Sequence, residues 1–368
     1  MIKKLIFALA LLPGVVVAQN ETGKLDSVLT SIYRNDQPGL SVIIRKGEQT
    51  LYQRSIGLAD MKTQTHITPA TNFNICSLTK QITAYALVKL FKEKKLSLDD
   101  PIRKFFPDMN PVTANAIRVR NLLNHSSGLV DHYDLVDRKA FQHFLDKDAY
   151  EAVKKSESTY FPVGTSYRYS NTAFCLLALI IEKVSGKTYP EYIQENIFKP
   201  LKMDNSLVLI PDRPVKNRAL GYNWDAGSGT FKLNDLNESI FFSTMGDGGV
   251  YTSVNDYIKW GEAFQNGKVL DKDIINQVRT RQNPVDAKRG LYYGYGWFVS
   301  GNEKNRCYYH TGSNGGFRTL VYCNPAARYS LVIFSNRTGV DLEELAKKLN
   351  SILKIDNCSF IALESLIS

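Results

Sequence analysis

A serine and a lysine three residues apart, Ser77 and Lys80, have the residue types and the spacing needed for nucleophilic catalysis. They stand at the start of a predicted helix, where residues three apart are neighbours with Cβ atoms about 5–6 Å apart, so the amine can reach the hydroxyl. A serine hydroxyl becomes a strong nucleophile only when a neighbouring base removes its proton. A helix N-terminus adds backbone N–H donors and positive potential, which favour an alkoxide and an oxyanion. The pair is therefore a candidate nucleophile and base.

The same spacing recurs near the end of the chain, at Ser351 and Lys354. That second pair belongs to the polar end of a predicted C-terminal helix, which is typical of a solvated surface. Ser77, by contrast, follows the apolar residues Phe73 and Ile75 and opens a helix with a long apolar face. The surrounding sequence therefore favours the first pair as the chemical one.

Tyr169 and Asn171 form a second candidate element, directly before a predicted apolar helix over Thr172–Val184. A phenol beside a lysine can carry protons between nucleophile and leaving group, and an Asn amide can hold a substrate carbonyl. Tyr-x-Asn also occurs at Tyr33 and Tyr322 in a chain with 20 tyrosines, so the tripeptide by itself can be a chance match.

A third candidate element is the run His310, Thr311, Gly312 and Ser313, on a predicted strand that leads into a glycine-rich turn. The Ser313 backbone N–H can serve as a second oxyanion donor beside that of Ser77. His310 and Thr311 are candidate partners for a substrate carboxylate, and Gly312 lets a substrate approach the strand closely. A purely structural strand histidine is the alternative interpretation.

In the order Ser-x-x-Lys, Tyr-x-Asn, His-Thr-Gly, these elements resemble the serine β-lactamase and D-alanyl-D-alanine carboxypeptidase (penicillin-binding) superfamily. The resemblance covers nearly the whole chain after its first residues. Four further phrases support it, at residues 122–129, 197–201, 248–253 and 294–297. It implies catalysis through an acyl-serine without metal or cofactor.

The resemblance also implies a role for each matching residue. Ser77 would be the nucleophile, and Lys80 and Tyr169 would transfer protons. Asn171 would bind the substrate amide, and His310 would form the positive end of the site. The remaining matching residues, Thr311, Gly312 and Ser313, would bind substrate along the strand, with the Ser77 and Ser313 amides as the oxyanion hole.

The histidine in the third element narrows the expected activity. Dedicated β-lactamases usually carry a lysine where this chain has His310, and a histidine is only partly charged near neutral pH. His-Thr-Gly looks more like the peptidase and esterase members. We therefore expect an exported serine hydrolase that cleaves an ester, peptide or amide bond and is most like D-Ala-D-Ala carboxypeptidases or esterases. A true β-lactamase and a non-catalytic ligand-binding protein on the same fold are the alternatives.

The elements that must position these residues predict an α/β (α+β) fold. Two β-rich runs near the start, at residues 40–45 and 50–56, read as a hairpin, and further strand signals follow between residues 297 and 335. Helical periodicity dominates the stretch between them. Strands from both chain ends are therefore expected to form one antiparallel sheet flanked by helices, with a mainly helical inserted lobe, as in β-lactamases and transpeptidases. The site should lie where the two lobes meet.

The first 18 residues have the three-part layout of a secretory signal. Lys3 and Lys4 precede an apolar run over Leu5–Val17, and small residues lead to Ala18. We predict cleavage after Ala18 and export to the periplasm or the medium. An uncleaved membrane anchor is the alternative, but the apolar run is shorter than the ~20 residues that span a bilayer. No stable membrane span is expected after cleavage.

Residues 19–368 are predicted to form a single catalytic domain, because no linker-like stretch divides them. Its sheet lobe would comprise about residues 20–75 and 285–368, and its helical lobe about residues 76–284.

Charge and motifs exclude several other classes. The formal net charge of +10 is spread along the chain, and no nucleic-acid-binding module is visible. Phosphate-loop and dinucleotide-binding fingerprints are missing from the sequence, and the spacing of His125, His132 and His143 matches no zinc site. We therefore expect no metal, cofactor or nucleic acid, and a small-molecule, peptide or ester substrate, with a cell-wall peptide among the candidates. Asp247 is expected to shape a turn beside the site, with a catalytic Asp247 as the alternative.

Five cysteines are an odd number without metal-binding or redox spacing. Cys307 and Cys323 flank the Gly312–Gly316 turn on its two sides, so a hairpin there would place them opposite each other. The sequence leaves two alternatives for these cysteines, a disulfide between them or two free thiols.

Overall fold

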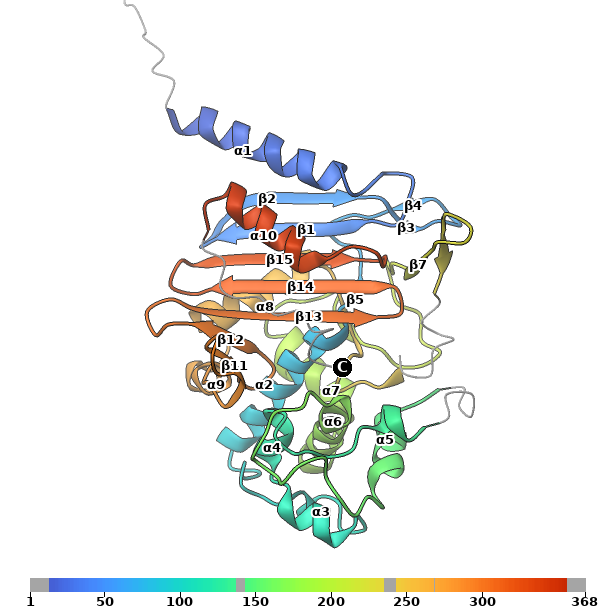
Figure 1. Cartoon of the computed structure of the whole chain (residues 1–368), viewed down its shortest axis with the longest axis vertical. Coiled ribbons are helices and arrows are strands. Elements are labelled where there is room, and N and C mark those ends of the chain that lie inside the picture. Colours follow the sequence, from blue (N-terminus) through green and yellow to red (C-terminus); the bar gives the residue numbers. More distant parts are fainter. Residues whose placement is uncertain (1–12, 137–142, 235–242, 268, 356–368) are drawn as a thin grey trace, which may run out of the picture.

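The structure, a computed structural model, describes residues 13–136, 143–234, 243–267 and 269–355 (Figure 1). Its centre is an eight-stranded antiparallel sheet in the order β10-β11-β12-β13-β14-β15-β1-β2. The strands are β1 (Leu40–Lys46), β2 (Gln49–Ile56), β10 (Asn283–Asp286), β11 (Leu291–Tyr293), β12 (Phe298–Gly301), β13 (Arg306–Asn314), β14 (Phe317–Asn324) and β15 (Tyr329–Ser335). Because β1 pairs with β15, the two ends of the chain share one sheet, which confirms the predicted fold class.

Both faces of this sheet are covered, as the burial of β15 shows. All seven of its residues are buried. Tyr329, Leu331 and Ile333 pack into one apolar cluster, while Val332 and Phe334 pack into the other. Successive side chains of a strand point to opposite faces, so an uninterrupted apolar run is what a strand between two helical layers requires.

Helices α1 (Pro13–Thr30) and α10 (Leu342–Ile352) lie across the outer face of the sheet (Figure 1). Leu25, Leu29, Leu345 and Leu349 bury their side chains against that face. Asp341 caps α10 by accepting hydrogen bonds from two backbone N–H groups of its first turn. Among the described residues, no helix has both the length and the apolar character needed to cross a membrane.

The inner face meets α8 (Val254–Asn266) and the inserted helical lobe (Figure 1). That lobe contains α2 (Thr79–Lys92), α3 (Pro111–Ala116), α4 (Val119–Leu123), α5 (Asp146–Val153), α6 (Asn171–Ser185), α7 (Tyr189–Ile193) and α9 (Lys272–Val278). Small sheets join the lobes: β3 (Leu58–Asp60) with β4 (Thr65–His66), β5 (Phe73–Asn74) with β9 (Val250–Thr252) and β6 (Leu207–Val208), and β7 (Tyr222–Asp225) with β8 (Thr230–Leu233). The predicted domain boundaries remain predictions, and most of the predicted signal lies outside the described residues.

Both arrangements that the sequence left open for Cys307 and Cys323, a disulfide between them and two free thiols, are wrong. Asn314 pairs with Phe317, so Cys323 stands opposite Tyr308 and one residue out of register with Cys307. A shift of one residue reverses the face of the sheet, and the two cysteines accordingly lie in different apolar clusters. Cys307 is disulfide-bonded, whereas Cys323 is a free, buried thiol.

Candidate active site

Ser77 lies in a single 3₁₀ turn, Cys76–Leu78, immediately before α2. The preceding residue, Cys76, has φ +50, a left-handed value that is uncommon outside glycine and is found most often where function requires strain. The Cys76 N–H donates to Asn74 Oδ1 over 2.7 Å, and the Ile75 N–H donates to the carbonyl of Val250 over 3.0 Å. The small sheet around β5 and β9 thus fixes the turn that carries the candidate nucleophile.

Lys80 is fully buried, and its ammonium group is surrounded by oxygen atoms. Nζ donates to Ser77 Oγ over 3.2 Å, to Asn171 Oδ1 over 2.8 Å and to the backbone carbonyl of Asp247 over 3.0 Å. Three acceptors use all three N–H donors of an ammonium. The expected convergence of lysine and serine is therefore present, and Asn171 comes to the same atom from α6.

Tyr169 lies beside Ser77 and Lys80, and it is 7% exposed. Lys80 Nζ lies 4.8 Å from the centre of its ring. Burial raises the pKa of the Tyr169 phenol, while the charge of Lys80 and polar interactions with Ser77 and Lys80 lower it. The hydroxyl makes no conventional hydrogen bond to any described residue, so it is a buried polar group without a fixed partner, next to the candidate nucleophile.

Strand β13 approaches the nucleophile turn closely because Gly312 has no side chain. A Cβ atom at this position would lie 2.8 Å from the Ile75 carbonyl oxygen and 2.9 Å from Cys76 Cβ. Both distances are shorter than van der Waals contact, so any larger residue would push the strand away. Gly312 thereby brings Ser313 and Ser77 to one cavity, as the sequence predicted.

That cavity has a volume of about 340 Å³ and lies between the sheet and the helical lobe. Twelve residues line it: Cys76, Ser77, Asp131, Tyr133, Asp134, Arg168, Tyr169, Asn171, Asp247, Gly248, Ser313 and Asn314. Four of the eight predicted site residues, Ser77, Tyr169, Asn171 and Ser313, are thus among its lining residues.

His310 does not line this cavity. It is fully buried, and burial followed by the charge of Lys80 lowers its pKa to about 3. Nδ1 lies 2.6 Å from the Thr311 carbonyl, which can only accept, so this nitrogen carries the proton and Nε2 accepts from the Tyr293 hydroxyl over 3.1 Å. The imidazole is therefore neutral near neutral pH, and its expected role as the positive end of the site is corrected.

Arg318 is a cation that the sequence-based prediction missed. It stands opposite Ser313 in the β13–β14 register. With Thr311, Gly312 and Ser313 it lines a second groove of about 310 Å³, which shares Ser313 with the first. Burial raises the pKa of the Cys76 thiol to about 12, and the charge of Arg318 is the largest influence that lowers it. The charge of Arg318 therefore reaches the nucleophile turn. A charged residue inside an apolar strand was the available signal.

His125 is the second residue that the prediction missed, although it stands in one of the phrases that supported the resemblance. Its backbone is left-handed, with φ +58, and its side chain is fully buried. Its Nδ1 accepts from the Ser170 N–H over 3.1 Å, and its carbonyl accepts from the Arg168 N–H over 3.0 Å. Its ring centre lies 4.4 Å from that of Tyr169. Burial, followed by the charge of Lys80, holds the pKa of His125 well below its usual value. His125 therefore contacts the Tyr169 segment as a neutral ring.

A large antiparallel sheet with an inserted helical lobe, and a serine at their junction paired with a buried lysine, define the class of β-lactamase-fold serine hydrolases. The chain belongs to the Beta-lactamase family, which it matches over residues 17–354.

Known relatives agree with this assignment. The chain is 28% identical to a penicillin-binding protein of Bacillus subtilis (strain 168), covering 87% of this chain and 72% of the relative. It is 25% identical to the protein flp of Staphylococcus aureus (strain MW2), covering 89% of this chain and 66% of that protein's length. Among solved structures, an octameric penicillin-binding protein homologue from Pyrococcus abyssi superposes with a TM-score of 0.76 at 26% identity, over 94% of this chain and 78% of the other. A D-amino acid amidase from Ochrobactrum anthropi SV3 has the same fold, with a TM-score of 0.76 at 24% identity over 92% and 99% of the two chains.

Proposed function

We propose that this protein is an exported serine hydrolase that cleaves an ester, peptide or amide bond through a covalent acyl group on Ser77. The observation that supports this most directly is the buried Lys80 amine within 3.2 Å of the Ser77 hydroxyl. The relatives named above support hydrolase chemistry on this fold, while the substrate and the export are our own proposals. Fractionation of expressing cells tests the export. The protein should be found outside the cytoplasm, and it should lack residues 1–18.

In the proposed first half-reaction, the Lys80 ammonium group first gives up one proton to solvent. The resulting amine then accepts the Ser77 proton as Oγ attacks the substrate carbonyl carbon. The N–H groups of Ser77 and Ser313 would hold the resulting oxyanion. When the tetrahedral intermediate collapses, the bond to the leaving group breaks, and that group takes a proton from Lys80 through the Tyr169 hydroxyl. Asn171 would hold the substrate amide with its side-chain nitrogen, because its Oδ1 is occupied by Lys80.

In the second half-reaction, a water molecule gives a proton to Lys80 through the Tyr169 hydroxyl and attacks the acyl-serine carbonyl. The ester bond to Ser77 breaks, and Oγ recovers its proton. The acid product leaves and the enzyme returns to its starting state. The position of the Tyr169 hydroxyl, buried without a fixed partner beside both groups, supports a role in passing protons in either direction.

Labelling tests the acyl-serine directly. Intact-mass measurement after treatment with a fluorophosphonate or a penicillin should show one adduct, and peptide mapping should place it on Ser77. Ser351→Ala is the matched control, because it removes the other serine of a Ser-x-x-Lys pair and should leave labelling unchanged. If the folded protein forms no adduct with any such reagent, a non-catalytic ligand-binding protein becomes the better account.

The carboxypeptidase and esterase subtypes are the favoured candidates over a true β-lactamase. The neutral, buried His310 supplies no cation at the position where dedicated β-lactamases usually carry a lysine. Arg318 in the adjoining groove is the cation on the other side of Ser313 that can engage a substrate carboxylate. A panel of short-chain p-nitrophenyl esters, a D-Ala-D-Ala peptide and a chromogenic cephalosporin separates the three. Fast turnover of the cephalosporin would reverse the order of these candidates.

A further inference from the structure

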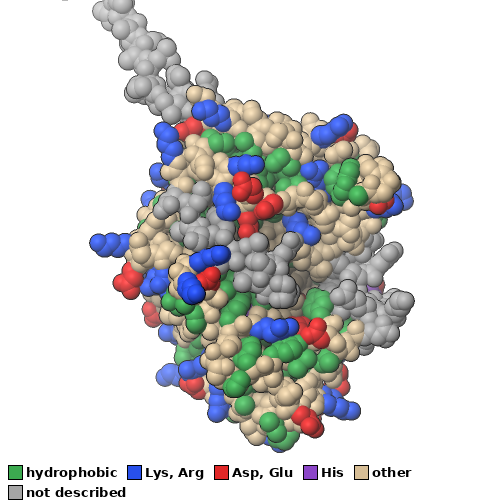
Figure 2. Space-filling view, viewed as in Figure 1, with side chains coloured by type: hydrophobic (Ala, Val, Ile, Leu, Met, Phe, Trp, Pro, Cys, Tyr) green, Lys and Arg blue, Asp and Glu red, His purple; other side chains and the backbone are tan. Residues whose placement is uncertain are grey.

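The charged groups around the catalytic cavity are unequal in sign. Three carboxylates line it, from Asp131, Asp134 and Asp247, against one cation, Arg168. The Arg168 guanidinium stacks over an aromatic ring at 4.0 Å. Over the visible face of the molecule, by contrast, basic and acidic side chains alternate without a patch of one sign (Figure 2). The cavity therefore differs from the general surface of this basic chain.

The neighbouring cation Lys80 reduces this negative charge but does not donate a hydrogen bond to any of the three carboxylates. Lys80 directs its three N–H donors to Ser77 Oγ, Asn171 Oδ1 and the Asp247 backbone carbonyl, and none goes to a carboxylate. His310 is neutral near neutral pH. Arg318 lies in the adjoining groove rather than among the residues that line this cavity.

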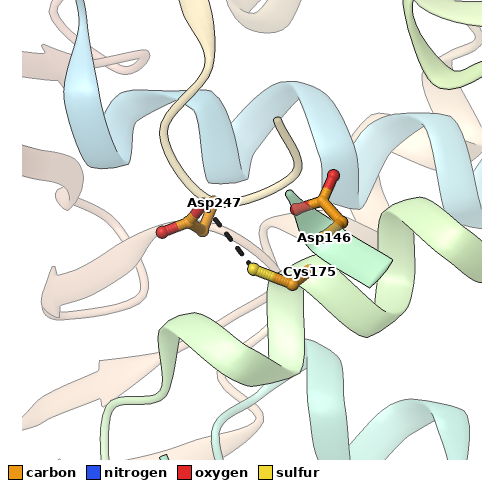
Figure 3. Close-up of side chains that lie close together, drawn as sticks. All are labelled: Asp146, Cys175 and Asp247. Atoms are coloured by element: carbon orange, nitrogen blue, oxygen red, sulfur yellow. Dashed lines mark hydrogen bonds between the residues drawn. The ribbon is translucent and has the colours of Figure 1, made fainter. Parts of the chain in front are cut away.

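Asp247 is the carboxylate with the strongest need for a partner. It is 5% exposed, and among the described residues its carboxylate receives one hydrogen bond, a 3.8 Å contact from Cys175 Sγ (Figure 3). A buried carboxylate normally requires several donors or a cation. A thiol is a weak donor, so this group is poorly satisfied where it meets the cavity.

Asp146 explains why the Asp247 loop stays in place. The Asp146 carboxylate accepts from the backbone N–H groups of Met245 and Gly246 at 3.1–3.3 Å. Burial and the proximity of Asp247 raise the pKa of Asp146 well above its usual value. Two such close carboxyl groups rarely ionise together. Asp146 is therefore the member of the pair that favours the protonated form. Asp247, which lies beside it (Figure 3), is the member that lines the cavity.

The other two carboxylates already have donors. Asp131 Oδ2 accepts from the N–H groups of Asn171 and Thr172 at the start of α6, and Asp134 accepts from the Tyr160 hydroxyl. They contribute negative potential to the cavity, while Asp247 has capacity for a new hydrogen bond.

We propose that this cavity binds a substrate whose acyl part carries a protonated amino group, namely an amide or ester of an amino acid or short peptide with a free amino terminus. This inference rests on the proposed function. The ammonium group would donate a charge-assisted hydrogen bond to Asp247 and gain from the field of Asp131 and Asp134. An N-acylated substrate would lack that charge and leave the buried carboxylate without its partner.

Matched substrates test the inference on the wild-type protein. kcat/KM is measured for alanine p-nitroanilide and its N-acetyl form, each as the D and the L enantiomer, with p-nitrophenyl acetate as a neutral ester. The free-amino form should be preferred by roughly 10- to 100-fold in at least one enantiomer, the range for a hydrogen bond to a charged group. The preference should decline as the pH rises through the pKa of the substrate amine, about 8.

Two variants assign the preference to its residues. Asp247→Asn should reduce the free-amino to N-acetyl ratio by about tenfold, and Asp134→Asn, at an exposed position that tolerates change, should reduce it less. Asp99→Asn is the control, since this carboxylate is 68% exposed and lies outside the cavity. Equal rates for the free-amino and N-acetyl forms, together with hydrolysis of the neutral ester at Ser77, overturn the inference and leave the proposed function standing. Absence of turnover and of any Ser77 adduct overturns both.

Discussion

Two regions of this protein carry the same Ser-x-x-Lys spacing in opposite surroundings. Ser77 and Lys80 lie at the junction of the lobes, where the lysine is fully buried and bonded to three oxygen atoms. Ser351 and Lys354 lie at the end of α10, both exposed, and the Ser351 hydroxyl donates to the backbone carbonyl of Lys347 over 2.8 Å.

The difference shows that spacing supplies proximity and the fold supplies reactivity. On α10, water solvates the lysine, and the serine hydroxyl satisfies a carbonyl of its own helix. At the junction, elements distant in sequence exclude water, direct an amine to one hydroxyl, and place a phenol ring and an amide around that amine. Electrostatic interactions are stronger in such surroundings. Each prediction below tests whether those surroundings, rather than the tetrapeptide, make the chemistry.

The largest expected effect comes from the two serines. Ser77→Ala should lower kcat by about 10,000-fold or more, because the covalent step is lost. Ser351→Ala should leave kcat unchanged. Steady-state kinetics on the best ester substrate measures both, and comparable losses in the two variants would contradict the assignment of the nucleophile.

The two lysines should differ nearly as much. Lys80→Ala should reduce kcat by about 1,000-fold, within the usual range for loss of a general base, and should also leave the Asn171 side chain without its donor. Lys354→Ala should change neither activity nor stability, since its side chain is exposed. Kinetics together with thermal unfolding distinguishes a chemical loss from a folding defect.

A smaller effect is expected from His125, which has no counterpart around Ser351. His125→Ala should lower kcat by about tenfold with little change in KM, because the Tyr169 segment loses the ring and the acceptor for the Ser170 N–H. His125→Asn should recover part of this loss, since asparagine tolerates a left-handed backbone and offers an acceptor in a similar place. If one limb of the pH–rate profile is displaced in the alanine variant and restored in the asparagine variant, the effect is on proton transfer. Identical losses of kcat in the two variants would argue against a role of His125 in proton transfer.

The smallest effect concerns His310. No effect is expected at neutral pH, and one appears only in acid. Its pKa of about 3 in the folded protein lies below the unfolded value of about 6.5. Between those values the unfolded chain binds a proton that the folded chain does not. The free energy of unfolding should therefore decrease as the pH is lowered, by up to about 1.4 kcal/mol per pH unit. Above pH 6.5 this contribution is fully present.

Denaturant unfolding between pH 7 and pH 4 measures that slope. His310→Gln should reduce it, whereas His66→Gln, at an exposed position on β4, should preserve it. An unchanged slope in His310→Gln would mean that other groups, with His125 first among them, carry the acid sensitivity.

Much of the fold was readable from the sequence because its strands and helices have strong, distinct periodicities. The predicted runs at 329–335 and 172–184 correspond to β15 and α6 within one residue at each end. The placement of Cys307 opposite Cys323 was wrong because the turn pairs Asn314 with Phe317, and hairpin register depends on turn geometry that spacing does not reveal.

The sequence by itself determined which residues could react: Ser77 and Lys80 on one helix start, Tyr169 and Asn171 before another, and Ser313 at a strand end. Only the tertiary structure decided their surroundings, since burial and charge depend on segments far apart in the chain. It made His310 a neutral interior ring, placed Arg318 beside Ser313, and set a poorly satisfied Asp247 at the cavity. Residue identity gives a group its possible chemistry, whereas its protonation and its partners follow from the dielectric and the neighbours that folding provides.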